Sequence, residues 1–168
     1  MVNLLPWQYG IWDSLTRRVH QAHAYLLHGP AGSGKRQMTE QFANYLLCKT
    51  PRNSAACGQC SSCRLFQADS HPDMYRLKPE EQGKGILISH VRELVGSIQQ
   101  TSQQGGRQVV IVEPAEVMTT ESANALLKSL EEPNAGTIFI LITHHLSFLL
   151  PTIKSRCVLQ ACPLPSIS

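Results

Sequence analysis

The chain has 168 residues, enough for one domain with a small insertion and a full hydrophobic core. It carries 15 Lys and Arg against 12 Asp and Glu, and this formal charge of +3 permits a nucleic-acid partner without requiring one. The first residues lack a basic export leader, and no apolar run approaches the roughly 18 residues of a membrane helix, which predicts a cytoplasmic protein. Its six cysteines are therefore expected to be metal ligands or free thiols rather than disulfides.

The amino-terminal part alternates helical and strand patterns around a glycine-rich loop. Apolar residues at helical spacing predict an amphipathic helix over 9–22, and a short buried strand follows over 23–28. The loop comes next, and the pattern from Lys35 predicts a second helix that ends at Cys48. Strand, glycine loop and helix in this order form the context of a phosphate-binding loop.

The loop matches a phosphate-binding template with one substitution. In G-x-x-x-x-G-K-[ST], glycines let backbone N–H groups face a phosphate, the lysine reaches the outer phosphates and the hydroxyl binds Mg²⁺. Gly29, Gly34 and Lys35 fit and Gly32 joins the cradle, whereas Arg36 stands where the hydroxyl belongs. Two outcomes remain open, namely ATP or ADP bound without hydrolysis and a loop that is empty or holds a simple anion.

Four of the six cysteines cluster in the next segment. Cys48 lies close upstream of Cys57, Cys60 and Cys63, which are separated by two residues each. This spacing predicts a closed, structural zinc site, because four thiolates leave no coordination position for a substrate. Two alternatives stay open, an iron–sulfur cluster and packed reduced thiols, although the Cys-Pro continuation of the bacterial cluster motif is missing.

The remaining patterns predict strands that alternate with helices. Ser89 is the expected cap of a helix that reaches 98 and has ended by Gly105-Gly106. The strand over 137–143 is apolar without alternation, as expected at the centre of a sheet covered on both faces. The other expected elements are strands over 74–77, 108–112 and 157–160, a helix over 119–132 and a short helical stretch from about 146. This order predicts an α/β fold with a parallel sheet whose ligand crevice lies at the carboxyl ends of its strands.

Several motifs together resemble the AAA+ domain of bacterial DNA polymerase III clamp-loader subunits. They are the glycine loop 29–35, the four cysteines, His71-Pro72-Asp73, the stretch NALLKSLEEP at 124–133 and Ser155-Arg156-Cys157. The resemblance implies a P-loop NTPase (AAA+, RecA-like) three-layer fold over 1–162, with a zinc-binding insertion at about 48–63. It also implies that 163–168 begin a linker to lid and collar domains, so that this piece alone is expected to be a monomer.

Two departures from the motor subunits make the chain similar to the delta-prime branch. Motors carry an Asp-Glu pair after the strand at 108–112, where the aspartate holds the metal and the glutamate activates water, and here the pair is Glu113-Pro114. Proline has no group that accepts a proton, and Pro114 is expected to aim Glu116 elsewhere. Together with Arg36, this predicts no Mg²⁺-dependent hydrolysis. Thr143 matches the family's polar sensor of the γ-phosphate, or it is an ordinary hydroxyl at a strand end.

The resemblance assigns the main catalytic contribution to Arg156. In the family's Ser-Arg-Cys motif the arginine is similar to an arginine finger that enters the nucleotide site of the neighbouring subunit. A guanidinium is permanently charged and stabilises the charge on the transferring phosphoryl oxygens. Ser155 is expected to orient the turn. The alternative is an arginine that caps the preceding helix.

The function implied by this resemblance is that of a non-hydrolysing subunit of the DNA polymerase III holoenzyme that helps load the sliding clamp onto primed DNA. The implied partners are the gamma/tau motor and delta subunits and, through the complex, the clamp and primer-template DNA. One alternative is an active gamma/tau-like ATPase. Another is a zinc ribbon that binds DNA, but Lys49, Arg52 and Arg64 are scattered and aromatic residues are sparse there.

Overall fold

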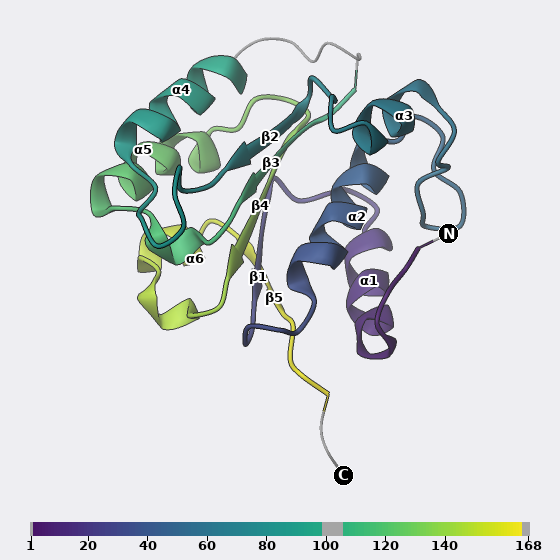
Figure 1. The fold of residues 1–168 in the computed structure, drawn as a ribbon, viewed down its shortest axis with the longest axis horizontal. Coiled ribbons are helices and arrows are strands. Elements are labelled where there is room, and N and C mark those ends of the chain that lie inside the picture. The colour runs from purple at the N-terminus through teal and green to yellow at the C-terminus, as the bar shows by residue number, and fades with distance from the viewer. Residues whose placement is uncertain (1, 99–105, 166–168) are drawn as a thin grey trace.

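A computed structural model describes residues 2–98 and 106–165 of the chain. These residues form a parallel sheet between two layers of helices (Figure 1). The five strands lie in the order β2-β3-β4-β1-β5, and each neighbouring pair is parallel. Their bounds are Ala24–His28 (β1), Met74–Leu77 (β2), Gln108–Val112 (β3), Thr137–Thr143 (β4) and Val158–Ala161 (β5). The predicted three-layer α/β fold is confirmed.

The helices divide between the two faces of the sheet. Helices α1, α2 and α3 lie on one side in Figure 1, and α4, α5 and α6 lie on the other. The helix bounds are Tyr9–Thr16 (α1), Lys35–Leu47 (α2), Ser61–Gln67 (α3), Ile88–Ile98 (α4), Thr120–Glu131 (α5) and Pro151–Lys154 (α6). Three short 3-10 helices span Pro6–Gln8 (η1), Ala115–Val117 (η2) and Leu146–Phe148 (η3). Among the described residues, no helix has the length and apolar character needed to cross a membrane.

Strand β4 explains why the sheet needs helices on both faces. It is the middle strand, and all seven of its residues are buried. Successive side chains of a strand point to opposite faces. Accordingly, Phe139 and Leu141 join the core beneath α4 and α5, whereas Ile140 and Ile142 join the core beneath α1 and α2. The prediction that this strand occupies the centre of the sheet is confirmed.

Some predicted element boundaries are wrong for local reasons. Helix α1 ends at Thr16 rather than at residue 22, and Val19 is 90% exposed because the segment after the helix turns away from the core. Ser89 is not a cap but lies inside α4, and the His90 imidazole instead accepts a hydrogen bond from the backbone N–H of Leu87. The predicted helix end near Gly105 and the linker residues 166–168 lie outside the described residues.

Helix α3 was not predicted at all. It lies within the cysteine segment, which the sequence indicates only as a turn-rich stretch. The thiol sulfur of Cys60 accepts a hydrogen bond from the backbone N–H of Cys63 and so caps the helix. Cysteine is not among the usual capping residues. The sequence therefore offered no ordinary signal for the start of this helix.

Candidate functional site

The phosphate loop lies where the carboxyl ends of the central strands meet. It joins β1 to α2, and His28 at the end of β1 pairs in register with Thr143 at the end of β4. A groove of about 750 Å³ opens over the loop. Its lining includes three predicted residues, Gly32, Gly34 and Lys35, together with Arg36, Glu113 and His144. The structure thus brings most of the predicted nucleotide site together.

The amino-terminal turn η1 holds one side of the loop. The side-chain amide of Gln8 donates to the carbonyl oxygens of Ser33 at 3.2 Å and of Gly34 at 2.9 Å, and the indole N–H of Trp7 also donates to Ser33. Gly34 adopts φ +82°, and a Cβ there would lie 2.6 Å from Gln8 Nε2. Glycine is favoured at this position by its backbone conformation and because a Cβ would displace the Gln8 side chain.

The ammonium group of Lys35 is folded into the loop. Lys35 is 2% exposed, and its Nζ donates to the carbonyl oxygens of Gly29 at 2.8 Å and Pro30 at 2.7 Å and to Ser33 Oγ at 3.2 Å. Burial lowers the pKa of this lysine, and the nearby Glu113 carboxylate opposes that shift. Contact of Lys35 with an outer phosphate would require it to exchange these internal hydrogen bonds.

Arg36 forms an ion pair with Glu113 across the groove. Its Nε lies 2.6 Å from Glu113 Oε1, and its Nη2 also contacts that oxygen. Hydrogen bonding to Glu113 raises the pKa of Arg36 above its ordinary value. The two positions at which the sequence departs from the motor pattern are therefore in direct contact, although 77 residues separate them.

Thr143 is bound to Glu116. Its hydroxyl donates to Glu116 Oε1 at 3.0 Å, while Glu116 Oε2 accepts from the backbone N–H of His144 at 3.1 Å. Glu116 thus faces the end of β4, and the expectation that Pro114 aims it away from a catalytic role stays a prediction. Thr143 itself does not line the groove, and its role as a sensor stays a prediction.

Ser155 and Arg156 do not line the phosphate groove of their own chain. They follow α6, where Arg156 donates from Nε at 3.2 Å and from Nη2 at 3.0 Å to Glu131 Oε1 at the end of α5. Ser155 Oγ donates to the carbonyl oxygen of Thr152, which fixes the turn. About 45% of each side chain in the Arg156–Glu131 pair is exposed to solvent.

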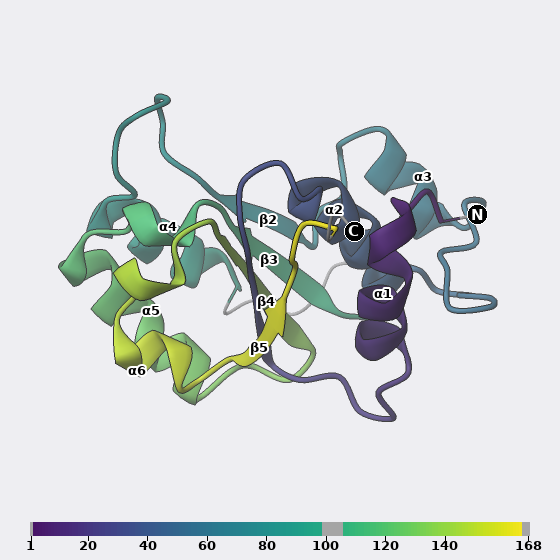
Figure 2. The ribbon, with the colours of Figure 1, turned by 90° about the horizontal axis from the view of Figure 1, so that it is seen from below.

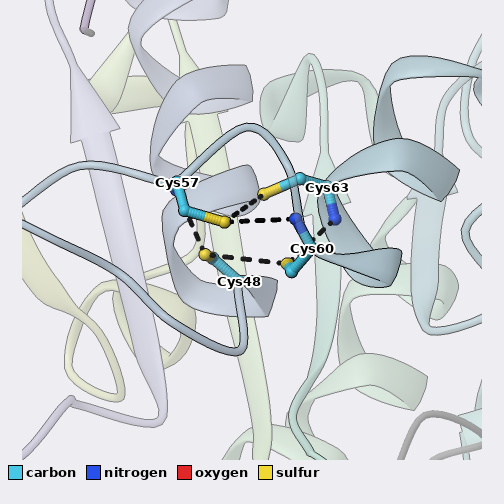
Figure 3. Close-up of side chains that lie close together, drawn as sticks. All are labelled: Cys48, Cys57, Cys60 and Cys63. Atoms are coloured by element: carbon cyan, nitrogen blue, oxygen red, sulfur yellow. Dashed lines mark hydrogen bonds between the residues drawn. The ribbon is translucent and has the colours of Figure 1, made fainter.

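The four predicted cysteine ligands converge on one point (Figure 3). Their sulfur atoms all lie within 4.8 Å of one another. The Cys48–Cys60 and Cys57–Cys63 sulfur pairs are each 3.9 Å apart. A tetrahedral ion with metal–sulfur bonds of about 2.3 Å requires sulfur atoms about 3.8 Å apart. The cluster has the size of a four-thiolate metal cage, and it fits a structural metal site.

Hydrogen bonds around this cluster prepare it for negative charge. Backbone N–H groups of Cys57, Gly58, Cys60 and Cys63 each donate to a sulfur atom of the cluster, at 3.2–3.4 Å. A hydrogen bond from Thr50, followed by backbone N–H groups, lowers the pKa of Cys57 to about 5. Burial raises the pKa of Cys63 to about 12. A metal ion binds these groups as thiolates, so metal binding at the cluster is coupled to the loss of their protons.

A buried histidine connects the cysteine segment to the sheet. The backbone N–H of Asp73 donates to His71 Nδ1, so that Nε2 carries the proton and faces Ser62 Oγ at 2.7 Å. Ser62 Oγ in turn donates at 2.6 Å to the carbonyl oxygen of Leu47, the last residue of α2. This chain of hydrogen bonds joins the start of β2, helix α3 and the helix end that precedes Cys48.

Sequence reasoning missed the partners of the predicted site residues. Gln8 hydrogen-bonds to the loop, Glu131 to Arg156, Ser62 to His71 and Glu116 to Thr143. Gln8 belongs to no motif, and the motifs that contain Glu131 and Ser62 gave no sign of these contacts. Only the distances in the folded chain reveal them.

The fold and the site together define a class of protein. A glycine loop between a central parallel strand and a helix, with a lysine at the start of that helix, is characteristic of P-loop nucleotide-binding proteins, here with an AAA+-type sheet. The family described as DNA polymerase III, delta subunit, matches residues 8–164. The chain belongs to this family, and the resemblance to clamp-loader subunits is confirmed.

The relatives point to delta-prime within that family. The chain is 56% identical over 165 residues to DNA polymerase III subunit delta' of Pseudomonas aeruginosa, a match that covers 98% of the chain and 50% of the relative. It is 41% identical to subunit delta' of Escherichia coli, covering 82% of the chain and 41% of the relative. The chain spans about half the length of such relatives and corresponds to their amino-terminal portion.

A solved structure supports the fold. A DNA polymerase III gamma subunit-related protein from Thermotoga maritima superimposes with a TM-score of 0.67 at 27% identity. That match covers 92% of the chain and 46% of the other protein. The fold of this chain is thus similar to that of a solved DNA polymerase III gamma subunit-related protein.

Proposed function

We propose that this chain is the nucleotide-binding-like portion of a non-hydrolysing clamp-loader subunit that supplies Arg156 to an ATPase subunit beside it. The observation that carries the proposal is the Arg36–Glu113 ion pair. It joins the two positions at which motor subunits hold their magnesium ion, and it makes both unsuited to metal binding. The proposed partners are the gamma/tau and delta subunits and, through the assembly, the sliding clamp and primer-template DNA.

The surroundings of the loop also favour loss of hydrolysis. Pro114 stands where the motors carry the glutamate that activates water, and it has no proton acceptor. Glu116 is the next carboxylate along the chain, but both of its oxygens accept hydrogen bonds from the end of β4. A general base must reach the proton that it removes. Neither residue meets that requirement here.

Two features support Arg156 as a finger that acts on another subunit. It lies outside the phosphate groove of its own chain, and it is half-exposed. Among the described residues, the guanidinium hydrogen-bonds only to the Glu131 carboxylate and, weakly at 3.5 Å, to Ser155 Oγ. Exposed ion pairs contribute little stability, about 0–1 kcal/mol. The guanidinium can therefore exchange Glu131 for a phosphate at small cost.

We further propose that the metal of the four-cysteine cluster is zinc and that its role is structural. Zinc accepts four thiolates in tetrahedral geometry, and the 3.9 Å sulfur pairs match that geometry. Four protein ligands complete the coordination. The ion would thus hold the end of α2, the start of α3 and the segment between them together.

Reconstitution of the clamp loader with an Arg156→Ala variant tests the proposed function. The full-length subunit is needed, because this chain spans only half of its relatives. Loss of a finger is expected to slow ATP hydrolysis at the adjoining site by about a thousandfold or more. Arg17→Ala is the matched control, since Arg17 is an exposed arginine directly after α1 whose only described ion pair is with Asp13. Unchanged hydrolysis with normal assembly would overturn the finger role.

The competing function is that of an active ATPase. It is tested because the chain is similar in structure to a gamma subunit-related protein. A steady-state assay of the purified full-length subunit decides between them. Turnover that disappears with Lys35→Ala would overturn the non-hydrolysing role. No turnover by the wild-type subunit supports it.

A further inference from the structure

The fold family implies a magnesium ion in the phosphate groove, and the residues present do not fit one. We propose that the groove instead binds a nucleoside polyphosphate without metal, with the guanidinium of Arg36 in the place of Mg²⁺. This inference rests on the proposed non-hydrolysing role, because a site without the ion can bind such a ligand but lacks the metal used in phosphoryl transfer.

The position of the guanidinium carries the proposal. Arg36 lies in the first turn of α2, directly after Lys35, and it reaches across to Glu113 at the end of β3. The Glu113 side chain is only 12% exposed, whereas that of Arg36 is 77% exposed. The guanidinium therefore compensates a nearly buried carboxylate on one side and faces the open groove on the other.

Magnesium does not fit this arrangement. Mg²⁺ requires near-octahedral oxygen ligands at about 2.0–2.1 Å and in P-loops uses a hydroxyl after the lysine. Arg36 provides no oxygen, and its Nε and Nη2 already contact Glu113 Oε1. An ion at Glu113 would have to displace the guanidinium and would then lie close to two cations, Arg36 and Lys35. The oxygens of Glu116 are already engaged by Thr143 and His144.

A polyphosphate without metal does fit. A guanidinium has five N–H donors in a planar fork suited to phosphate, and the contacts to Glu113 use only one edge of Arg36. Lys35 and the loop supply further positive charge and backbone N–H groups. The buried Nδ1 of His144 has no hydrogen-bond partner among the described residues, and His144 lines the groove. The volume of about 750 Å³ lies within the usual range for nucleotide-sized ligands and exceeds what pyrophosphate alone needs.

The test measures binding of a fluorescent ADP analogue, MANT-ADP, to the purified chain with Mg²⁺ and with EDTA. The wild-type chain is expected to bind at least as tightly in EDTA as in Mg²⁺. Arg36→Thr restores the hydroxyl of the template and frees Glu113, so Mg²⁺ is expected to strengthen its binding by about tenfold. Arg17→Thr is the matched control, since the two arginines are similarly exposed, and it is expected to behave as the wild type.

Two results would overturn the proposal. They are no saturable binding of MANT-ADP by the wild-type chain and binding that requires Mg²⁺. The wild-type comparison decides the question even if Arg36→Thr does not fold, which circular dichroism would reveal. Failure here leaves the finger role untouched, because that role is measured at Arg156 through the neighbouring subunit.

Discussion

Substitution of Gly34 by alanine tests how the amino-terminal turn holds the phosphate loop. A Cβ at Gly34 would lie 2.6 Å from Gln8 Nε2 and 2.7 Å from Leu5 Cδ1. Gly32 provides a matched control, because it has nearly the same backbone conformation, φ +84° against +82°, but no atom within 4 Å of its Cβ position. The two variants separate backbone strain from the steric effect of the turn.

The expected free energies follow from these contacts. A left-handed conformation costs a non-glycine residue about 1–2 kcal/mol, and this cost applies to both variants. In Gly34→Ala the Gln8 side chain must also move and give up its hydrogen bonds to Ser33 and Gly34, each worth about 1 kcal/mol. We therefore expect Gly32→Ala to lose about 1–2 kcal/mol of unfolding free energy and Gly34→Ala about 3–4 kcal/mol.

Equilibrium unfolding in urea measures this difference, and thermal melting gives a second readout. For a chain of this size the extra loss of about 2 kcal/mol lowers the melting temperature by about 4–8 °C. In a Gln8→Ala background, the extra cost of Gly34→Ala over Gly32→Ala is expected to shrink, because the two Gln8 hydrogen bonds are no longer there to lose and only Leu5 Cδ1 still obstructs the Cβ. Equal losses for both glycine variants in the wild-type background would refute the role assigned to the turn.

Two further predictions concern the metal cluster and the finger. The purified chain is expected to hold one zinc ion, which elemental analysis would show to be lost in Cys63→Ser but kept in Cys157→Ser, because Cys157 lies outside the cluster. Zinc retained by Cys63→Ser would contradict the ligand set. In the reconstituted loader, Glu131→Gln is expected to change the neighbour's ATP hydrolysis by no more than about fivefold, because the exposed pair is worth at most about 1 kcal/mol and Arg156 leaves Glu131 for the phosphate, and Glu132→Gln leaves the rate unchanged. A loss with Glu131→Gln as large as that with Arg156→Ala would contradict this exchange.

The elements that the sequence predicted well are those whose signals are local. Strand β4 is an uninterrupted apolar run, and its observed bounds Thr137–Thr143 equal the predicted ones. Helix α2 begins at Lys35 as predicted, because the glycine loop fixes where the helix can start. The cysteine ligands were likewise predictable, since their spacing alone places four thiols within reach of one ion.

The contacts that the loop makes with residues far away in the sequence could not be predicted from local patterns. Arg36 and Glu113 lie 77 residues apart, and Gln8 and Gly34 lie 26 apart. Their contact depends on the register of the sheet and on how the amino-terminal turn packs, neither of which leaves a periodic pattern in the sequence. The two substitutions therefore looked like independent losses, whereas in the structure they form one ion pair.

The cations of the loop and Arg156 differ in the contacts that they must give up before they can bind a ligand. Lys35 and Arg36 already hold hydrogen bonds or an ion pair inside the chain, so a ligand in the groove gains only the difference between old and new contacts. Arg156 is held by the exposed carboxylate of Glu131, which gives it up at small cost. This difference agrees with the proposed function, in which Arg156 leaves Glu131 for the site of a neighbouring subunit, whereas the loop keeps its internal contacts until a ligand replaces them.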